Sequence, residues 1–230
     1  MKKAVCLLSG GLDSTTALYW TKSQGCDVSA LTIHYGQLHE CEIEAAKTIC
    51  RGLEIPHQII SVPMPWGGSA LLDKDIPIPI DRDAAQMGQD IPATYVPARN
   101  TVFLSLAASY SEAIGAEVIV IGANALDYSG YPDCRPEYFE SFTETLKRGT
   151  RSGAEGRPIQ IEAPLLRMTK KEIVLLAQSL KVPLEKTWSC YLGKERPCGV
   201  CDSCRLRQKG FGGAGLEDPQ ISDVSARILS

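Results

Sequence analysis

The 230-residue sequence has no long apolar run and no excess of basic charge. The apolar stretch after Lys3 lasts only about five residues before Gly10 interrupts it, too short for a signal-peptide core. No stretch approaches the roughly 18 apolar residues of a membrane span. The formal net charge of −3 gives no basic field, which argues against a large nucleic-acid footprint. These absences predict a cytoplasmic protein that acts on neither a membrane nor a nucleic acid.

Histidine is also scarce, whereas cysteine is not. The three histidines, His34, His39 and His57, lack metal-ligand spacing; His57 is expected in a strand, and His39 is the functional candidate. Nine cysteines, an odd number without an export signal, indicate reduced thiols and metal ligands rather than disulfides. Hydrophobic residues at 44% and charged residues at 22% are ordinary for a chain with one substantial core.

Two common phosphate-binding patterns are absent from the glycine-rich segment near the N-terminus. No lysine follows Gly10 and Gly11 as the Walker pattern requires, and the third glycine of the dinucleotide-binding fingerprint is missing. The segment instead reads Leu-Ser-Gly-Gly-Leu-Asp-Ser-Thr-Thr (residues 8–16), before a helical pattern that begins near residue 17. Glycines permit a sharp turn and free N–H groups at a helix start bind anions, so we expect a phosphate-binding loop. An ordinary strand-to-helix turn is the alternative.

The order of predicted elements indicates an α/β fold. Strands are expected at residues 4–8, 28–33, 57–62, 117–122 and 159–161. Helices are expected at residues 42–53, 101–114, around 139–146, and up to Leu180 after a capping box formed by Thr169 and Glu172. This alternation predicts a parallel sheet with covering helices. Between them, the proline-rich residues 63–97 are expected to form a long functional loop or lid.

Four cysteines gather near the C-terminus, namely Cys190, Cys198, Cys201 and Cys204. Two residues separate each of the last three, and four thiolates suit tetrahedral Zn²⁺. Since four protein ligands leave no open coordination position, the metal is expected to be structural. An iron–sulfur cluster, or free or disulfide-bonded cysteines, are the alternatives. We therefore expect an α/β domain of residues 1–183 and a zinc-binding segment of residues 184–230 packed on it.

Two cations are predicted at helix starts, where the helix dipole disfavours them. Arg99 and Lys170 are therefore expected to serve a bound anion, with a solvated surface arginine as the alternative for Arg99. The segment Asp127–Arg135 follows the strand at 117–122, at the edge where α/β sheets bind ligands. Its tyrosines, carboxylates and arginine suit a flat heterocycle that bears a carboxylate, whereas a turn with incidental tyrosines is the alternative.

Six blocks follow one another along the chain. They are Leu-Ser-Gly-Gly-Leu-Asp-Ser-Thr-Thr (8–16), Tyr-Gly-Gln-x-His (35–39), Val-Pro-Ala-Arg-Asn (96–100), Asp-Tyr-Ser-Gly-Tyr-Pro-Asp-Cys-Arg (127–135), Thr-Trp-Ser-Cys-Tyr (187–191) and Cys-Gly-x-Cys-x-x-Cys (198–204). Together they closely resemble the 7-cyano-7-deazaguanine synthases, within the PP-loop ATP pyrophosphatases. One departure is Leu38, which stands where the family usually has arginine.

The resemblance implies a Rossmann-like (HUP-type) doubly wound parallel sheet with a C-terminal zinc-bound segment. It implies an ATP-dependent ligase that converts 7-carboxy-7-deazaguanine and ammonia to the nitrile, through adenylated carboxylate and amide intermediates, in queuosine precursor biosynthesis. The cofactors it implies are ATP, Mg²⁺ and one structural Zn²⁺. The expected partners are these small molecules and a second copy in a homodimer.

Site residues are expected from the same blocks. The ATP-binding residues are Leu8, Ser9, Gly10, Gly11, Leu12, Asp13, Ser14, Thr15, Thr16, Ala17 and Leu18. The substrate-binding residues are Tyr35, Gln37, His39, Arg99, Asp127, Tyr128, Tyr131, Asp133 and Arg135. The catalytic residues are Asp13, Ser14, Arg99 and Lys170. Asp13 is expected near Mg²⁺, and Arg135 is expected to meet the substrate carboxylate.

Two other functions stay open at this point. A PP-loop tRNA-modifying enzyme, of the thiolase or lysidine-synthetase type, would need a basic patch for RNA. A zinc-stabilised nucleotide-binding protein without chemistry is the second alternative.

Overall fold

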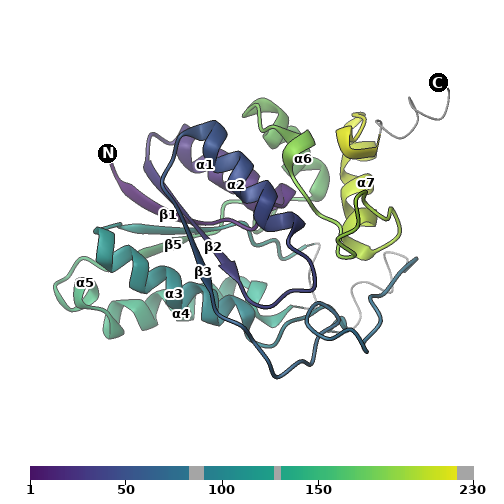
Figure 1. Cartoon of the computed structure of the whole chain (residues 1–230). Coiled ribbons are helices and arrows are strands. Elements are labelled where there is room, and N and C mark those ends of the chain that lie inside the picture. The colour runs from purple at the N-terminus through teal and green to yellow at the C-terminus, as the bar shows by residue number, and fades with distance from the viewer. Residues whose placement is uncertain (83–90, 127–130, 222–230) are drawn as a thin grey trace.

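The computed structural model describes residues 1–82, 91–126 and 131–221, which contain one five-stranded parallel sheet (Figure 1). In spatial order its strands are β3 (His57–Ser61), β2 (Asp27–His34), β1 (Lys3–Leu7), β4 (Val118–Ile121) and β5 (Gln160–Glu162). All five predicted strands are confirmed, with ends within one residue of the predicted ones.

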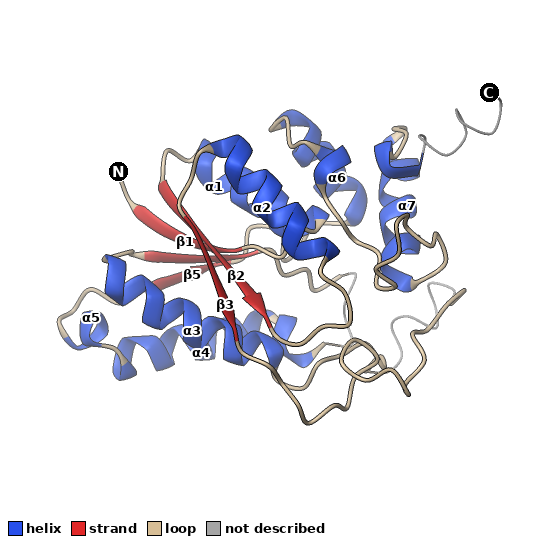
Figure 2. Cartoon of the chain, in the orientation of Figure 1, coloured by secondary structure: helices blue, strands red, loops and turns tan. Residues whose placement is uncertain are grey.

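Helices cover both faces of the sheet (Figure 2). They are α1 (Leu12–Ser23), α2 (Cys41–Leu53), α3 (Arg99–Ile114), α4 (Pro136–Gly149), α5 (Arg151–Ala154), α6 (Lys170–Ser179) and α7 (Asp202–Ala214), with short 3₁₀ turns η2 (Pro132–Cys134) and η3 (Leu184–Lys186). One face carries α1, α2, α6 and α7, and the other carries α3, α4 and α5. The doubly wound α/β fold is therefore confirmed.

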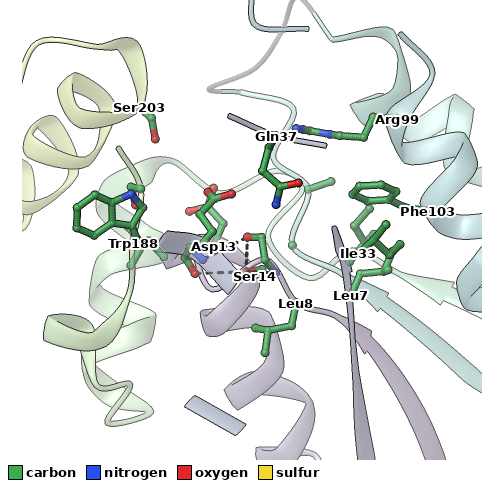
Figure 3. A pocket seen from close by; sticks show the side chains of 18 of the residues that line it. Leu7, Leu8, Asp13, Ser14, Ile33, Gln37, Arg99, Phe103, Trp188 and Ser203 are labelled. Carbon is green, nitrogen blue, oxygen red and sulfur yellow. Dashed lines mark hydrogen bonds between the residues drawn. The ribbon is translucent and has the colours of Figure 1, made fainter. Parts of the chain in front are cut away.

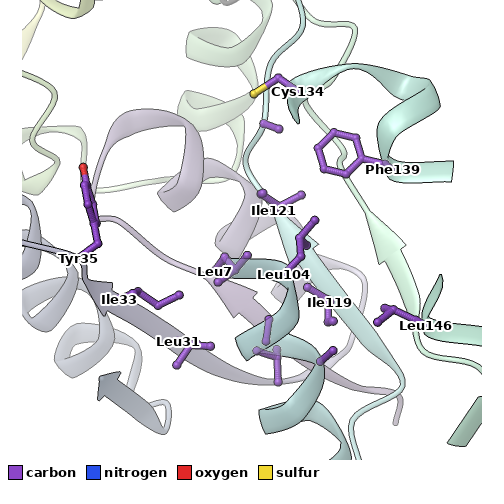
Figure 4. Close-up of a cluster of buried hydrophobic side chains, with 14 of the residues drawn as sticks. Leu7, Leu31, Ile33, Tyr35, Leu104, Ile119, Ile121, Cys134, Phe139 and Leu146 are labelled. Carbon is purple, nitrogen blue, oxygen red and sulfur yellow. The ribbon is translucent and has the colours of Figure 1, made fainter. Parts of the chain in front are cut away.

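The central strand β1 contributes to a core on each side of the sheet. Val5 and Leu7 pack with residues of α3 and α4 in the cluster of Figure 4, whereas Ala4 and Cys6 pack with residues of α1 and α2. Burial on both faces explains why the apolar runs of β1 and β4 are continuous. Between β3 and β4 the chain crosses from the β3 edge of the sheet to the other side of β1, where β4 pairs with it, so the carboxyl ends of β1 and β4 form the switch point where such sheets bind ligands.

Helix α1 begins at Leu12, not near residue 17 as predicted. The predicted loop residues Asp13–Thr16 therefore form the first helical turns. The Thr16 hydroxyl donates to the carbonyl of Leu12 at 2.7 Å, which satisfies it within the helix. Serine and threonine have low intrinsic helix propensity, so the sequence Ser14–Thr16 led to a predicted start of the helix that was too late in the chain.

Helix α7 was not predicted. It contains Gly210, Gly212 and Gly213, which lower helical propensity, and it packs against α6. A Cβ at Gly210 would lie 2.5 Å from Cγ of Lys170 and 3.1 Å from its carbonyl oxygen, so the close approach of the two helices requires glycine there. Phe211 of α7 is buried in the core on the α1 face, which fixes the tail to the α/β core.

The long loop after β3 is attached to the tail. Among its described residues there is no helix or strand; Ile80 pairs with Cys201 in an isolated antiparallel bridge, and the N–H of Asp81 donates to the carbonyl of Val200 at 2.9 Å. In the described part of the chain, no helix combines the length and hydropathy needed to cross a membrane.

We expect Gly122→Ala to destabilise the protein. Gly122 directly follows β4, and a Cβ there would lie 2.7 Å from both N and Cα of Ser14, so the end of β4 and the start of α1 would have to separate. The cost should be about 2 kcal/mol in the free energy of unfolding, measured by urea denaturation. Gly52→Ala is the matched control, because open space surrounds Gly52 in α2. It should stabilise the protein by about 0.5–1 kcal/mol. Equal stability of the two variants would contradict the close approach.

Candidate active site and metal centre

A cavity of about 220 Å³ lies at the carboxyl ends of β1, β2 and β4 (Figure 3). Asp13 and Ser14, from the start of α1, lie at its centre together with Gln37. Arg99 of α3 lies on one side, and Trp188 of the tail lies on the other. The cavity therefore joins the loop after β1, helix α3 and the C-terminal segment at the switch point of the sheet.

The loop between β1 and α1 is braced by its own serines. The hydroxyls of Ser9 and Ser14 lie 2.9 Å apart, and the N–H of Gly11 donates to Oγ of Ser9 at 3.2 Å. Gly11 is the N-cap of α1 and has no side chain to cap it, so within the described part of the chain the first turn of this helix has no side-chain cap. Gly10 has a φ of +93°, and a Cβ there would lie 2.2 Å from the carbonyl of Glu42. This geometry fits an anion such as phosphate.

Lys170 reaches the same loop from α6. Its Nζ lies 2.8 and 2.7 Å from the two carboxylate oxygens of Asp13, and Lys170 is only 6% exposed. The Asp13 carboxylate thus offsets the unfavourable position of a cation at a helix start. The helix itself is stabilised by the predicted capping box of Thr169 and Glu172, which is confirmed.

Arg99 lies at the start of α3, half-buried in the cavity wall. Its guanidinium donates to the Tyr35 hydroxyl at 3.4 Å and lies 5.6 Å from the centroid of that ring. Burial alone would lower the pKa of Arg99, but the neighbouring Tyr35 and Tyr131 raise it above its usual value. Arg99 therefore presents a permanent positive charge to the cavity.

The structure brings only part of each predicted set to the cavity. The residues that line it are Leu8, Ser9, Gly11, Leu12, Asp13, Ser14, Tyr35, Gln37, His39, Arg99, Tyr131 and Lys170. The residues that do not line it are Gly10, Thr15, Thr16, Ala17, Leu18, Asp133 and Arg135. Asp127 and Tyr128 lie outside the described residues. Gly10 faces α2, and Ala17 and Leu18 belong to the core.

Two residues of the Asp-Tyr-Ser-Gly-Tyr-Pro-Asp-Cys-Arg block have structural partners instead. The carboxylate of Asp133 accepts from the backbone N–H of Asn100 at 3.0 Å, which supplies an acceptor to the first turn of α3. Arg135 is exposed at the N-cap of α4. In contrast, Tyr131 is buried, lines the cavity and bonds its hydroxyl to that of Thr94 at 2.9 Å.

Several cavity residues were missed by the sequence analysis. Trp188 and Ser189 lie in a block that carried the resemblance but received no role. Glu42 follows another such block by three residues. Ser203 gave no signal, because helix α7, which positions it, was not predicted. The backbone N–H of Trp188 donates to the carbonyl of Gly10 at 2.9 Å, so the tail is bonded directly to the loop between β1 and α1.

The four cysteines of the tail converge. The Sγ atoms of Cys190, Cys198, Cys201 and Cys204 all lie within 4.8 Å of one another. The N–H of Cys198 donates to Sγ of Cys190 at 3.3 Å, and the N–H of Cys201 donates to Sγ of Cys198 at 3.3 Å. N–H groups aimed at sulfur stabilise thiolates, and four thiolates at this spacing form a metal site.

Arg207 of α7 connects this tail to the cavity. All five of its N–H donors have acceptors: both carboxylate oxygens of Asp218, the hydroxyls of Thr187 and Ser189, and the carbonyl of Leu184. Arg207 and Asp218 are 4% and 8% exposed, so their charges compensate one another away from water. The pair holds the segment that carries Trp188 over the loop.

The fold and the site define a doubly wound α/β protein with a parallel sheet and a Ser-Gly-Gly-Leu-Asp-Ser loop at its switch point. Residues 3–215 match the family model "Queuosine biosynthesis protein QueC", and the chain belongs to this family.

Three curated relatives are all 7-cyano-7-deazaguanine synthases. The chain is 55% identical to the protein of Trichodesmium erythraeum over 94% of this chain and 99% of the relative. It is 53% identical to that of Nostoc punctiforme, over 95% and 99% of the two chains. It is 51% identical to that of the more distant Picrophilus torridus, over 97% and 93%.

We expect Arg207→Ala to lower the free energy of unfolding by about 3–5 kcal/mol, because Asp218 would stay buried without its cation. Arg205→Ala in the same helix is the control, since its ion pair with Asp81 is exposed and should contribute less than about 1 kcal/mol. Chemical denaturation of both variants measures the difference. Similar decreases in the free energy of unfolding of the two variants would show that the buried Arg207–Asp218 pair contributes no more than an exposed ion pair.

Proposed function

We propose that the cavity activates the carboxylate of 7-carboxy-7-deazaguanine with ATP and replaces the activated oxygen with nitrogen from ammonia, giving 7-cyano-7-deazaguanine for queuosine biosynthesis. The observation that carries this proposal is that the phosphate-binding loop and Arg99 face one cavity. Activation requires the ATP phosphates and the acid to meet there. Membership of the QueC family supports the choice of substrate.

The chemistry suits a site without a covalent nucleophile. A carboxylate is a poor electrophile until one of its oxygens becomes a phosphoester with AMP. Ammonia then displaces AMP to form the amide. A second adenylation, on the amide oxygen, permits elimination of AMP to the nitrile. Positioning and charge neutralisation are therefore the contributions that the protein must make.

The residues at the phosphate-binding loop take the nucleotide side. Gly11, Ser14 and the N–H groups of the first turn of α1 bind phosphate oxygens. Asp13 supplies a carboxylate for Mg²⁺, which would neutralise phosphate charge when bound. Lys170, next to Asp13, neutralises charge on the leaving group.

The opposite wall takes the acid substrate. Of the basic residues predicted for this role, Arg99 lines the cavity and Arg135 does not. We therefore assign the carboxylate or its adenylate to Arg99. Tyr131 and Phe103 provide aromatic surface at the same wall for a flat ring. The remaining substrate-side assignments, the homodimer, the cytoplasmic location and the domain boundary at residue 183 stay predictions.

One assay tests the function. The protein is incubated with Mg·ATP, ammonia and either 7-carboxy-7-deazaguanine or unmodified tRNA, and the products are identified by mass spectrometry. We expect the amide and then the nitrile from the acid, and no modified tRNA. Modified tRNA would favour a tRNA-modifying PP-loop enzyme, and binding of ATP without any product would favour a nucleotide-binding protein.

Ser14→Ala and Lys170→Ala should each lower kcat by about 100-fold, because each removes a group that contacts the phosphates or their charge. Lys171→Ala is the matched control for Lys170, since Lys171 is exposed on the next position of α6. Its kcat should stay within about twofold of the wild type. Circular dichroism checks that each variant is folded. Near-normal kcat in both Ser14→Ala and Lys170→Ala would contradict the assignment.

We propose Zn²⁺ as the metal held by the four-cysteine site, in a structural role. Metal analysis of the purified protein should give about one zinc per chain. Cys201→Ser should lose the metal and make the tail sensitive to protease, because the tail has little apolar core of its own. Cys26→Ser lies outside the cluster and should keep both the metal and the resistance. Iron in place of zinc, or a tail that stays protected without metal, would overturn this proposal.

A further inference from the structure

Glu42 places a carboxylate at the junction of the two halves of the cavity. It lies in the first turn of α2 and lines the cavity. Its Oε1 would lie 4.0 Å from a Cβ built on Gly11, and the same Cβ would lie 3.3 Å from Oγ of Ser9. The carboxylate is therefore beside the phosphate-binding loop. It also interacts electrostatically with Arg99 on the acid-substrate side.

Among the described residues, none forms a hydrogen bond or an ion pair with the side chain of Glu42. The other carboxylate that lines the cavity has a partner, since Asp13 pairs with Lys170. The buried aspartates also have partners: Asp133 with Asn100, Asp202 with Arg82, and Asp218 with Arg207. An unpaired carboxylate in a cavity wall is costly to retain for structure alone.

Burial raises the pKa of the Glu42 carboxyl to about 7, although the positive charge of Arg99 opposes the shift. Of the other charged groups that line the cavity, Asp13 pairs with Lys170 and Arg207 pairs with Asp218, so Arg99 is the cation whose charge acts on Glu42. A group that gains and loses a proton near neutral pH suits proton transfer.

The reaction needs such a transfer in both rounds. When ammonia adds to the acyl adenylate, the new nitrogen carries a positive charge and must lose a proton before the C–O bond breaks and AMP leaves with the bonding electrons. In the second round, the nitrogen of the adenylated amide carries two protons. The first leaves to give the neutral imidate, and the second leaves as the third C–N bond forms and AMP departs with the electrons of the C–O bond. All of these protons depart from a nitrogen on the same carbon.

We propose that Glu42 is the catalytic base that accepts the proton from this nitrogen in both rounds. This inference rests on the proposed function. The position of the carboxylate, between the loop that binds the phosphates and the arginine assigned to the acid, is where the reacting carbon must lie. After each round the proton passes to solvent and the carboxylate is restored.

His39 is the other candidate base at the cavity. Its ring packs on the tail turn at Gly193, where an added Cβ would lie 2.0 Å from Cβ of His39. Its Nδ1 is buried without a hydrogen-bond partner among the described residues, and burial lowers its pKa. His39 is thus enclosed by the tail, whereas Oε1 of Glu42 lies beside the loop that binds the phosphates.

The test separates activation from amination. In Glu42→Gln, acid-dependent cleavage of ATP in a single turnover without ammonia should stay within about threefold of the wild type. Formation of amide and nitrile with ammonia should fall by about 100-fold. Glu42→Asp should recover part of the lost rate. Glu44→Gln is the control, because Glu44 lies two positions along α2 and is exposed; it should leave both steps unchanged.

The pH profile gives a second readout that a structural role would not move. A base must be ionised, so the wild-type amination rate, expressed per concentration of free ammonia, should be full above pH 7 and decline as the pH falls through about 7. Glu42→Gln should lack this decline. If the variant keeps the decline, or loses ATP cleavage and amination in parallel, Glu42 is not the base.

The proposed function is judged separately, on the wild type. A wild-type protein that cleaves ATP with the acid yet forms neither amide nor nitrile would refute the function. A wild type that forms the nitrile, with a Glu42→Gln variant equally fast, would refute only the role of Glu42.

Discussion

The confinement of the phosphate-binding loop is the constraint on which the rest of the structure depends. Gly10 contacts α2 so closely that a Cβ would overlap a backbone carbonyl, and at Gly122, directly after β4, a Cβ would overlap the backbone of Ser14 in α1. From the C-terminal tail, the backbone N–H of Trp188 donates a hydrogen bond to the carbonyl of Gly10. The loop is therefore held by backbone contacts on three sides, and its N–H groups need no rearrangement to receive an anion.

The charges of the cavity are arranged in relation to this loop. Lys170 and Asp13 compensate one another beside it, whereas Arg99 lies across the cavity, with aromatic rings and a long hydrogen bond for neighbours. A compensated pair can exchange partners when phosphate or a divalent cation arrives, while an arginine held against aromatic surface is ready for a carboxylate. The two walls thus suit the two reactants of an activation step.

Much of the fold could be predicted because strands buried on both faces leave continuous apolar runs, as in β4. The start of α1 was predicted about five residues too far along the chain, because Thr16 fits the helix only when its hydroxyl donates to the carbonyl of Leu12. Helix α7 was missed because the reason for Gly210 is its contact with Lys170, which is 40 residues away in the sequence. The same dependence on long-range contacts explains why Asp133 was predicted to bind substrate and why Glu42 was missed. The sequence alone cannot tell that the Asp133 carboxylate accepts a hydrogen bond from α3 while Glu42 lines the cavity.

The hydrogen bond from Trp188 to Gly10 also bears on the order in which the site is completed during synthesis. The β1–α1 loop is synthesised long before Trp188, so the nascent α/β core carries an open loop until the segment with Trp188 emerges from the ribosome. Contacts of such large sequence separation form late, because the closure entropy precedes any gain from packing. Completion of the cavity and synthesis of the segment with Trp188 are thereby linked through a single backbone contact.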